Sequence, residues 1–99
     1  MPRTLEFLDE AIEEAEAAAR WYAERSQTAA AAFADEIDSA IAEITRLPLA
    51  WPAYNHNTRR FLLRRFPYSV VYRVSESTTM IVAVAHGHRR PGYWRDRLG

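Results

Sequence analysis

Apolar residues in the first half of the chain recur at helical spacing. Within residues 10–25 they are separated by three or four positions, which predicts one apolar face of an amphipathic helix. Residues 27–47 carry the same spacing over a longer stretch, so a second helix is predicted there. The first apolar face consists of Ile12, Ala15, Ala19 and Tyr22, and the second of Ala30, Phe33, Ile37, Ile41 (or Ala40), Ile44 and Leu47.

Polar residues and prolines mark where these helices begin and end. Asp9 is predicted to cap the first helix, where the carboxylate would also suit the positive end of the helix dipole. Ser26 is predicted to cap the second helix, and Pro48 to end it. Because the break at Ser26 is short, the two helices are expected to form an antiparallel hairpin.

Alternating and β-branched residues predict four strands. A short strand is expected over residues 3–8, and three more over 59–65, 68–75 and 79–86. The last is almost wholly apolar and is therefore placed centrally in the sheet, while residues 47–57 are predicted to be a loop. The order β-α-α-β-β-β predicts an α+β fold in which the helical hairpin packs on one face of a mainly antiparallel four-stranded sheet.

Length and composition bound the class of protein. The 99 residues suit one domain spanning 1–99, and the absence of cysteine excludes disulfides and thiolate metal sites. No apolar run has the length of a signal peptide or a membrane span, so a cytoplasmic protein without membrane contact is expected. We also expect no cofactor and no metal.

The charges are unevenly distributed although the net charge is zero. Eleven acidic residues and four arginines lie in positions 1–50, whereas positions 51–99 contain nine arginines and two acidic residues. Lysine is absent, which excludes chemistry that needs a titratable amine. Arginine favours bidentate recognition of phosphate or carboxylate, so a local basic face is expected in the second half.

Two segments of the second half resemble the RelE/ParE family of toxins from type II toxin–antitoxin systems (plasmid-stabilisation type). These are FPYSVVYRV at 66–74 and HGHRRPGYW at 86–94, separated by an apolar strand in the order and spacing of that family. The resemblance implies a partner antitoxin. ParE-like members inhibit DNA gyrase, whereas RelE-like members cut messenger RNA, usually on the ribosome, and fold alone does not separate the two.

If the chain is a ribonuclease, it needs an acid, a base and cations on the phosphoryl group. His88 is the main candidate for proton transfer, because His56 is interpreted as a surface residue. His86 is interpreted as a structural histidine on the same side of its strand as Met80, Val82 and Val84. Tyr93 and Trp94 are interpreted as packing residues in preference to a stacking platform. The complete candidate catalytic set is His88, Arg65, Arg73, Arg89 and Tyr93.

The zero net charge and the lack of lysine favour the ParE-like interpretation, since ribonuclease members tend to be basic and often use lysine. We therefore expect a growth inhibitor acting on gyrase and neutralised by a cognate antitoxin, whose acidic amphipathic segment docks on the arginine-rich sheet face or beside the helical hairpin. The alternatives are a metal-independent messenger-RNA endoribonuclease and a non-toxic remnant that only binds antitoxin. Convergence of Arg65, Arg73, His88 and Arg89 on one concave surface would favour the ribonuclease.

Overall fold

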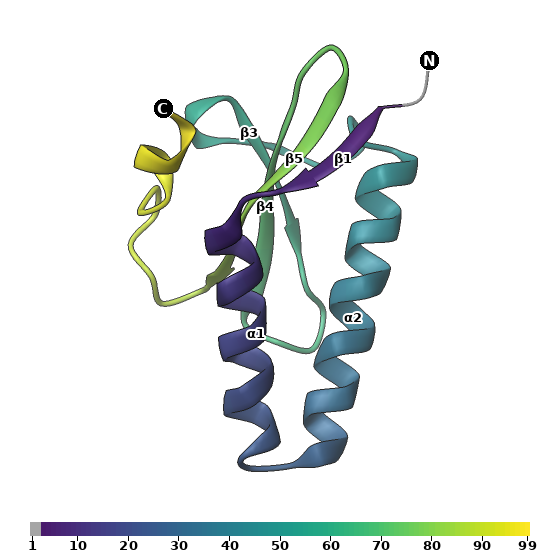
Figure 1. Cartoon of the computed structure of the whole chain (residues 1–99), viewed down its shortest axis with the longest axis vertical. Helices are drawn as coiled ribbons and strands as arrows, with labels where there is room; N and C mark the ends of the chain where they lie inside the picture. Colours follow the sequence, from purple (N-terminus) through teal and green to yellow (C-terminus); the bar gives the residue numbers. More distant parts are fainter. Residues whose placement is uncertain (1–2) are drawn as a thin grey trace.

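The computed structural model describes residues 3–99 and contains two helices and five strands (Figure 1). The predicted order of the elements is confirmed, with one strand added between the second helix and the strand predicted at 59–65. Two short 3-10 turns, at Asn55–Asn57 and Arg95–Leu98, complete the chain. The elements are β1 (Thr4–Phe7), α1 (Asp9–Ala23), α2 (Gln27–Arg46), β2 (Ala53–Tyr54), β3 (Thr58–Leu62), β4 (Tyr68–Val74) and β5 (Thr78–His86).

The five strands form one sheet in the order β1-β5-β4-β3-β2. β1 runs parallel to β5, and all the other neighbours are antiparallel. The predicted central position of β5 is confirmed, because β1 and β4 flank it. The prediction of four strands was wrong by one: Ala53 and Tyr54, inside the predicted loop, pair with Arg59 and Thr58. A two-residue strand leaves no alternating pattern long enough to recognise.

The helices form the predicted hairpin and lie side by side against one face of the sheet (Figure 1). Ser26 caps α2 as predicted, since its hydroxyl accepts a hydrogen bond of 3.1 Å from the Ala29 N–H. The predicted Asp9 cap was wrong. Leu8 is the N-cap of α1 and makes no side-chain cap, and Asp9 lies in the first turn, where its charge still complements the helix dipole.

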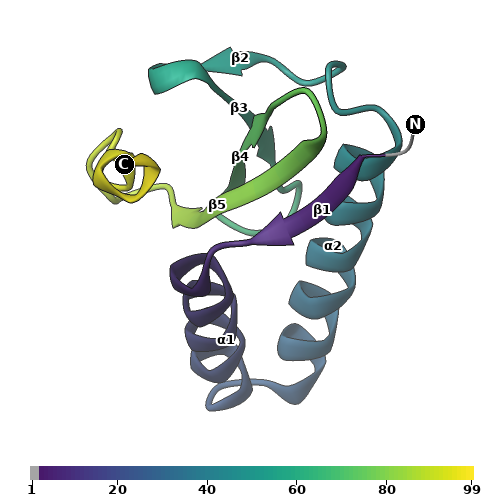
Figure 2. The same ribbon diagram turned by 45° about the horizontal axis from the view of Figure 1, so that its top comes forward.

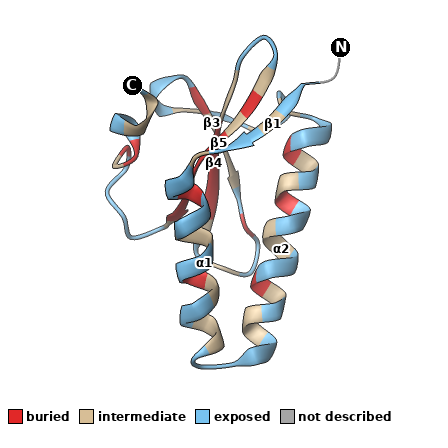
Figure 3. Cartoon of the chain, in the orientation of Figure 1, coloured by how far each residue is buried: buried red, intermediate tan, exposed pale blue. Residues whose placement is uncertain are grey.

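The main core lies between the helices and the sheet. Phe33 and Ile44 of α2 are 1% and 0% exposed and pack against β4 and β5, as predicted, while Ile37 and Ile41 are half-buried around them. The face predicted for α1 was partly wrong, because Ile12 is 42% exposed and Ala11 and Ala18 are buried instead (Figure 3). The small alanine side chains let α1 approach β5 closely, which rotates the larger Ile12 out of the core.

A β-bulge changes the direction of side chains along β5. Val71 pairs with Ala83 but the next residue, Tyr72, pairs with Ile81, so Val82 is the extra residue. Before the bulge Met80 and Val82 face away from the helices, whereas Val84 after it packs in the core beneath them. The prediction that His86 shares a side with Met80 and Val82 was therefore wrong, although it does share one with Val84.

The face of the sheet opposite the helices, hereafter the outer face, is covered by the C-terminal segment, residues 87–99 (Figure 2). Trp94 is 1% exposed there and packs on Val71, Val82 and Ala83. Its packing role is thus confirmed, and the segment ends in the 3-10 turn at Arg95–Leu98. Neither helix in the described part of the chain has the length and apolar character needed to cross a membrane.

Candidate functional site

Glu14 of α1 joins three parts of the molecule. Its carboxylate accepts two hydrogen bonds of 2.9 Å from the Arg97 guanidinium and one of 2.5 Å from the Tyr93 hydroxyl. It also accepts the backbone N–H of Val84 at 3.0 Å. β1 ends at Phe7, so β5 beyond this point has no strand partner on that side, and Glu14 takes the place of one.

The ionisation of these groups reflects their shared contacts. Burial opposes the charged form of Glu14, but hydrogen bonds from Arg97, Tyr93 and Val84 together hold the pKa of its carboxyl below the usual value of 4.5. Burial, followed by the Glu14 carboxylate, raises the pKa of Tyr93, and the same carboxylate raises the pKa of Arg97. All three groups therefore hold their ordinary charge states at neutral pH. Their hydrogen bonds attach the C-terminal segment to α1.

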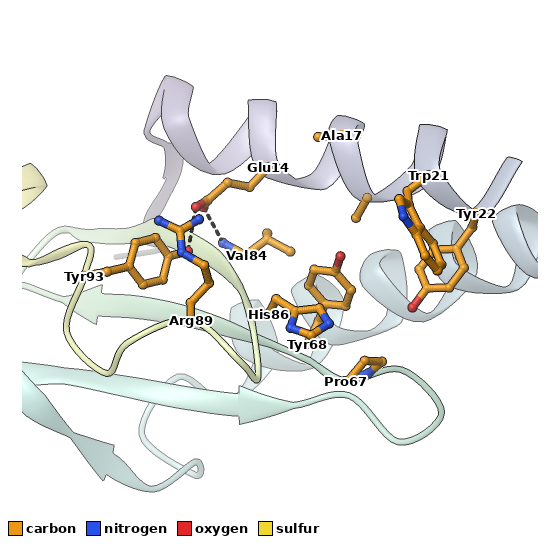
Figure 4. Close-up of a pocket in the computed structure, with 11 residues that line it drawn as sticks. Glu14, Ala17, Trp21, Tyr22, Pro67, Tyr68, Val84, His86, Arg89 and Tyr93 are labelled. Atoms are coloured by element: carbon orange, nitrogen blue, oxygen red, sulfur yellow. Dashed lines mark hydrogen bonds between the residues drawn. The ribbon is translucent and has the colours of Figure 1, made fainter. Parts of the chain in front are cut away.

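Next to this cluster, a groove of about 470 Å³ runs between α1 and the end of β5 (Figure 4). Trp21 and Tyr22 of α1 form one wall, and Tyr68 and His86 form part of the other. Trp21 is 50% exposed, which leaves a large apolar surface open to solvent. The charged side chains in the lining are Glu14, which is already bound by Arg97, and Arg89. The groove thus suits a partner with apolar anchors and acidic groups.

His86 lies in the wall of the groove and contacts two other rings. Its ring centroid is 5.0 Å from that of Tyr68 and 5.0 Å from that of His88. Its Nδ1 accepts the backbone N–H of His88 at 3.0 Å, so in the neutral imidazole the proton is on Nε2. His88 itself is exposed. Among residues 3–99, no cluster of three or more His, Asp or Glu side chains could hold a metal ion.

The five candidate catalytic residues do not meet at one point. Arg65 is held by Glu36 of α2, with 3.4 Å between its Nε and the carboxylate. Arg73 donates hydrogen bonds of 2.6 and 3.3 Å to the backbone carbonyls of His56 and Asn57, both in the left-handed region. Arg73 pairs with Met80 at one end of β5, whereas Tyr68 pairs with His86 at the other. Five residues of strand, about 17 Å, separate the two positions on β4.

Tyr93 and Arg89 are already engaged with neighbours. The Arg89 guanidinium carbon lies 3.9 Å from the centroid of the Tyr93 ring, a cation–π contact. The Tyr93 hydroxyl is bound to Glu14 and does not point at open solvent. His56, interpreted from the sequence as a surface residue, is exposed, and its ring lies 5.8 Å from that of Trp94.

A small cavity of about 100 Å³ on the outer face has the charge pattern of an anion site. Arg60, Arg89 and Arg90 line it, together with Ser69 and Tyr54, and no carboxylate is among its lining residues. The Arg60 guanidinium lies 4.1 Å from the centroid of the Tyr54 ring, which fixes its direction. The expected basic face is therefore present in part, in a narrow cavity bounded by Trp94.

Sequence reasoning missed Glu14, Arg97 and Trp21. Glu14 is one of eleven acidic residues in the first half of the chain, and nothing in its neighbours marks it as the one that reaches the C-terminal segment. A signal for Trp21 was available, because a tryptophan beside Tyr22 lies just off the apolar face of the helix and is thus expected to be partly exposed.

Comparison with known proteins places the chain in a family. The sequence of residues 5–91 matches the family described as the ParE toxin of the type II toxin–antitoxin system parDE. No curated protein matches significantly. The solved structures that share the fold include two toxin–antitoxin systems. A chromosomal ParDE toxin–antitoxin system from P. aeruginosa is 18% identical over 85% of this chain and 95% of that one, with a TM-score of 0.68.

The second structure is the toxin–antitoxin complex RelBE2 from Mycobacterium tuberculosis. It is 23% identical, with a TM-score of 0.54, over 87% of this chain and 92% of that chain. At these identities the two structures support the fold, while the sequence match covers nearly the whole chain. The chain therefore belongs to the ParE toxin family of type II toxin–antitoxin systems.

Proposed function

We propose that the chain is a growth inhibitor that binds DNA gyrase and that a cognate antitoxin neutralises it by docking in the groove between α1 and β5. The observation that carries the inhibitory function is the covered outer face, where Trp94 is 1% exposed. An RNA strand would need an open surface on which its phosphate could reach an acid, a base and several cations. The part of the outer face around Val71, Val82 and Ala83 is instead packed against Trp94.

The positions of the candidate catalytic residues support the same proposal. Arg65 is paired with a carboxylate, Arg73 with backbone carbonyls at the far end of the sheet, and Tyr93 with Glu14. General acid–base catalysis requires the reacting groups to be within hydrogen-bond reach of one substrate. A protein that inhibits by binding needs no such convergence.

The groove supports docking of an acidic, amphipathic antitoxin segment. Trp21, Tyr22 and Tyr68 offer apolar surface, and aromatic side chains contribute strongly at interfaces. Arg89 at the other end offers a partner for a carboxylate, which would fix the orientation of the segment. Because Glu14 occupies the Val84 N–H, the occupant cannot add as a strand at this position and must bind through its side chains.

The test is induction of the chain in a bacterium with and without the protein encoded beside it. We expect growth arrest that the neighbouring protein relieves, loss of gyrase supercoiling activity with the purified chain, and intact transcripts. Arrest with transcript cleavage and normal supercoiling would contradict the gyrase proposal. Absence of arrest, with retained binding to the neighbouring protein, would favour the non-toxic remnant.

A second candidate function, a metal-independent messenger-RNA endoribonuclease, is favoured by the cavity that Arg60, Arg89 and Arg90 line. Three guanidinium groups without a carboxylate suit a phosphate. His88, two residues from His86 in the wall of that cavity, would supply the proton transfer. Cleavage of a transcript by the purified chain that Arg60→Ala abolishes would support this function over gyrase inhibition.

A further inference from the structure

One edge of the sheet lacks a neighbouring strand along part of its length. β2 pairs with β3 only at Ala53 and Tyr54, and beyond them Pro52 accepts the Arg60 N–H at 3.1 Å. Because proline has no N–H, it cannot donate a hydrogen bond to the Arg60 carbonyl. Since Leu63 donates its N–H toward β4, strand alternation directs the N–H and C=O of Leu62 toward the open side. The edge at residues 60–62 thus offers unpaired backbone groups.

An apolar pocket of about 320 Å³ lies beside this edge. Trp51 and Phe61, whose ring centroids are 4.6 Å apart, line it together with Pro52. Leu62, at the rim, is 62% exposed. Apolar surface next to unpaired strand groups is the combination that binds an added strand, where the backbone supplies affinity and a side-chain pocket supplies specificity.

The charges around the pocket limit what can occupy it. Its only charged lining residues are Arg60 and Arg64, and no carboxylate lines it. A second copy of the chain is disfavoured, because antiparallel pairing centred on Leu62 would place Arg60 of each copy opposite Arg64 of the other, and like charges in such pairs are destabilising. An acidic segment would instead pair with both arginines.

We propose that the edge of β3 at residues 60–62, with this pocket, is the surface by which the chain engages its cellular target, through an extended acidic segment of that protein. The inference rests on the proposed function as a toxin. The groove proposed for the antitoxin lies beyond β4, on the β5 side of the sheet, so it leaves the edge of β3 open to a second partner. The segment adds to β3, inserts one aliphatic side chain beside Trp51, and places carboxylates next to Arg60 and Arg64.

The experiment measures colony formation during induction in a host without the antitoxin. The variants are Leu62→Asp and Arg64→Glu, both at exposed positions, so that folding is retained and can be confirmed by thermal melting. Matched controls are Leu47→Asp, at a leucine 45% exposed that does not line the pocket, and Arg95→Glu in the C-terminal turn. Each variant is also tested for co-purification with the antitoxin.

We expect both edge variants to restore colony counts by about tenfold or more, as loss of an anchor residue does, while antitoxin binding is kept and both controls remain toxic. Edge variants that arrest growth like the unmodified chain would overturn the inference. So would loss of antitoxin binding with toxicity retained, which would make the edge an antitoxin surface. If the unmodified chain causes no arrest, the proposed function fails first and the inference falls with it.

Discussion

The Arg97 guanidinium donates two hydrogen bonds of 2.9 Å to the Glu14 carboxylate, although the two residues are 83 positions apart in the chain. Both side chains are mostly buried, and Arg97 also donates to the Val82 carbonyl at 3.1 Å. The pair therefore satisfies the Val82 carbonyl at the bulge and the Val84 N–H after it, in the part of β5 that β1 no longer reaches. In this way a contact between α1 and the C-terminal turn substitutes for a strand.

Removing either partner should destabilise the fold. Glu14→Gln or Arg97→Gln is expected to lower the free energy of unfolding by about 1.5–3 kcal/mol, the range for hydrogen bonds to charged groups. The measurement is urea denaturation, and the double variant should lose less than the sum of the two. Arg46→Gln is the matched control, because the Arg46–Glu43 pair is exposed and should contribute under about 1 kcal/mol. If Arg46→Gln lowered the free energy of unfolding as much as Arg97→Gln does, the Glu14–Arg97 pair would contribute no more than an exposed ion pair.

Because of the Glu14–Arg97 pair, we expect the stability of the fold to fall at acidic pH. The pKa of Glu14 is lower in the folded chain than the ordinary 4.5, so its contribution is fully present above about pH 4.5 and is lost as the pH falls through the folded-state value. Stability of the wild type should therefore decline on acidification more steeply than that of Glu14→Gln. Denaturation midpoints between pH 6 and pH 3 measure this, and parallel curves would contradict the prediction. Tyr93→Phe, which removes one donor, should shift the decline to higher pH.

The core of α2 offers a test of packing. Phe33→Ala should cost about 3–5 kcal/mol, because the ring is 1% exposed and packs on Tyr22, Phe66 and Tyr68. Ile37→Ala should cost less, since the side chain is only half-buried. Thermal or urea unfolding gives both values. Losses under about 0.5 kcal/mol at both positions would mean that this helix face is not the core.

How far the sequence determines this fold differs from element to element. The spacing of apolar residues was enough to predict α2, because large apolar residues repeat along one face through five turns and Ser26 marks the start of the helix. It failed at Val82, since one extra residue reverses the alternation of β5 without any change in composition. It failed also at Ile12, where close packing of alanines outweighs the hydrophobicity of the larger residue.

The candidate site could be predicted less well than the fold. Local sequence indicates which arginines and histidines exist, but a side chain's partner depends on segments distant in the chain. Arg73 was a candidate catalytic residue, but it binds the backbone carbonyls of His56 and Asn57, two residues in the left-handed conformation. The groove arises where α1 passes the end of β5, so its residues come from elements that no motif connects.

Antitoxin docking in the groove predicts a specific loss of affinity. Trp21→Ala should weaken binding of the cognate antitoxin about tenfold or more, because Trp21 is a half-exposed aromatic anchor and contributes little to the core. Arg89→Glu should weaken it further at low salt, through repulsion of an acidic segment. Titration calorimetry measures both, with Arg95→Glu as the charge control. Failure of the unmodified chain to bind its neighbour-encoded partner at moderate salt would refute the docking proposal altogether.

The last prediction separates inhibition from catalysis. Loss of a general acid or base typically lowers a rate by a factor on the order of 10²–10⁴, so a ribonuclease that uses His88 would lose its toxicity in His88→Ala. His88 is exposed, and its backbone N–H rather than its ring makes the contact with His86 Nδ1, so the variant should fold normally. If the chain acts by binding gyrase, His88→Ala should arrest growth as the wild type does and leave transcripts intact. A folded His88→Ala that is harmless, beside a wild type that cuts transcripts, would instead identify His88 as a catalytic residue and replace gyrase with messenger RNA as the target.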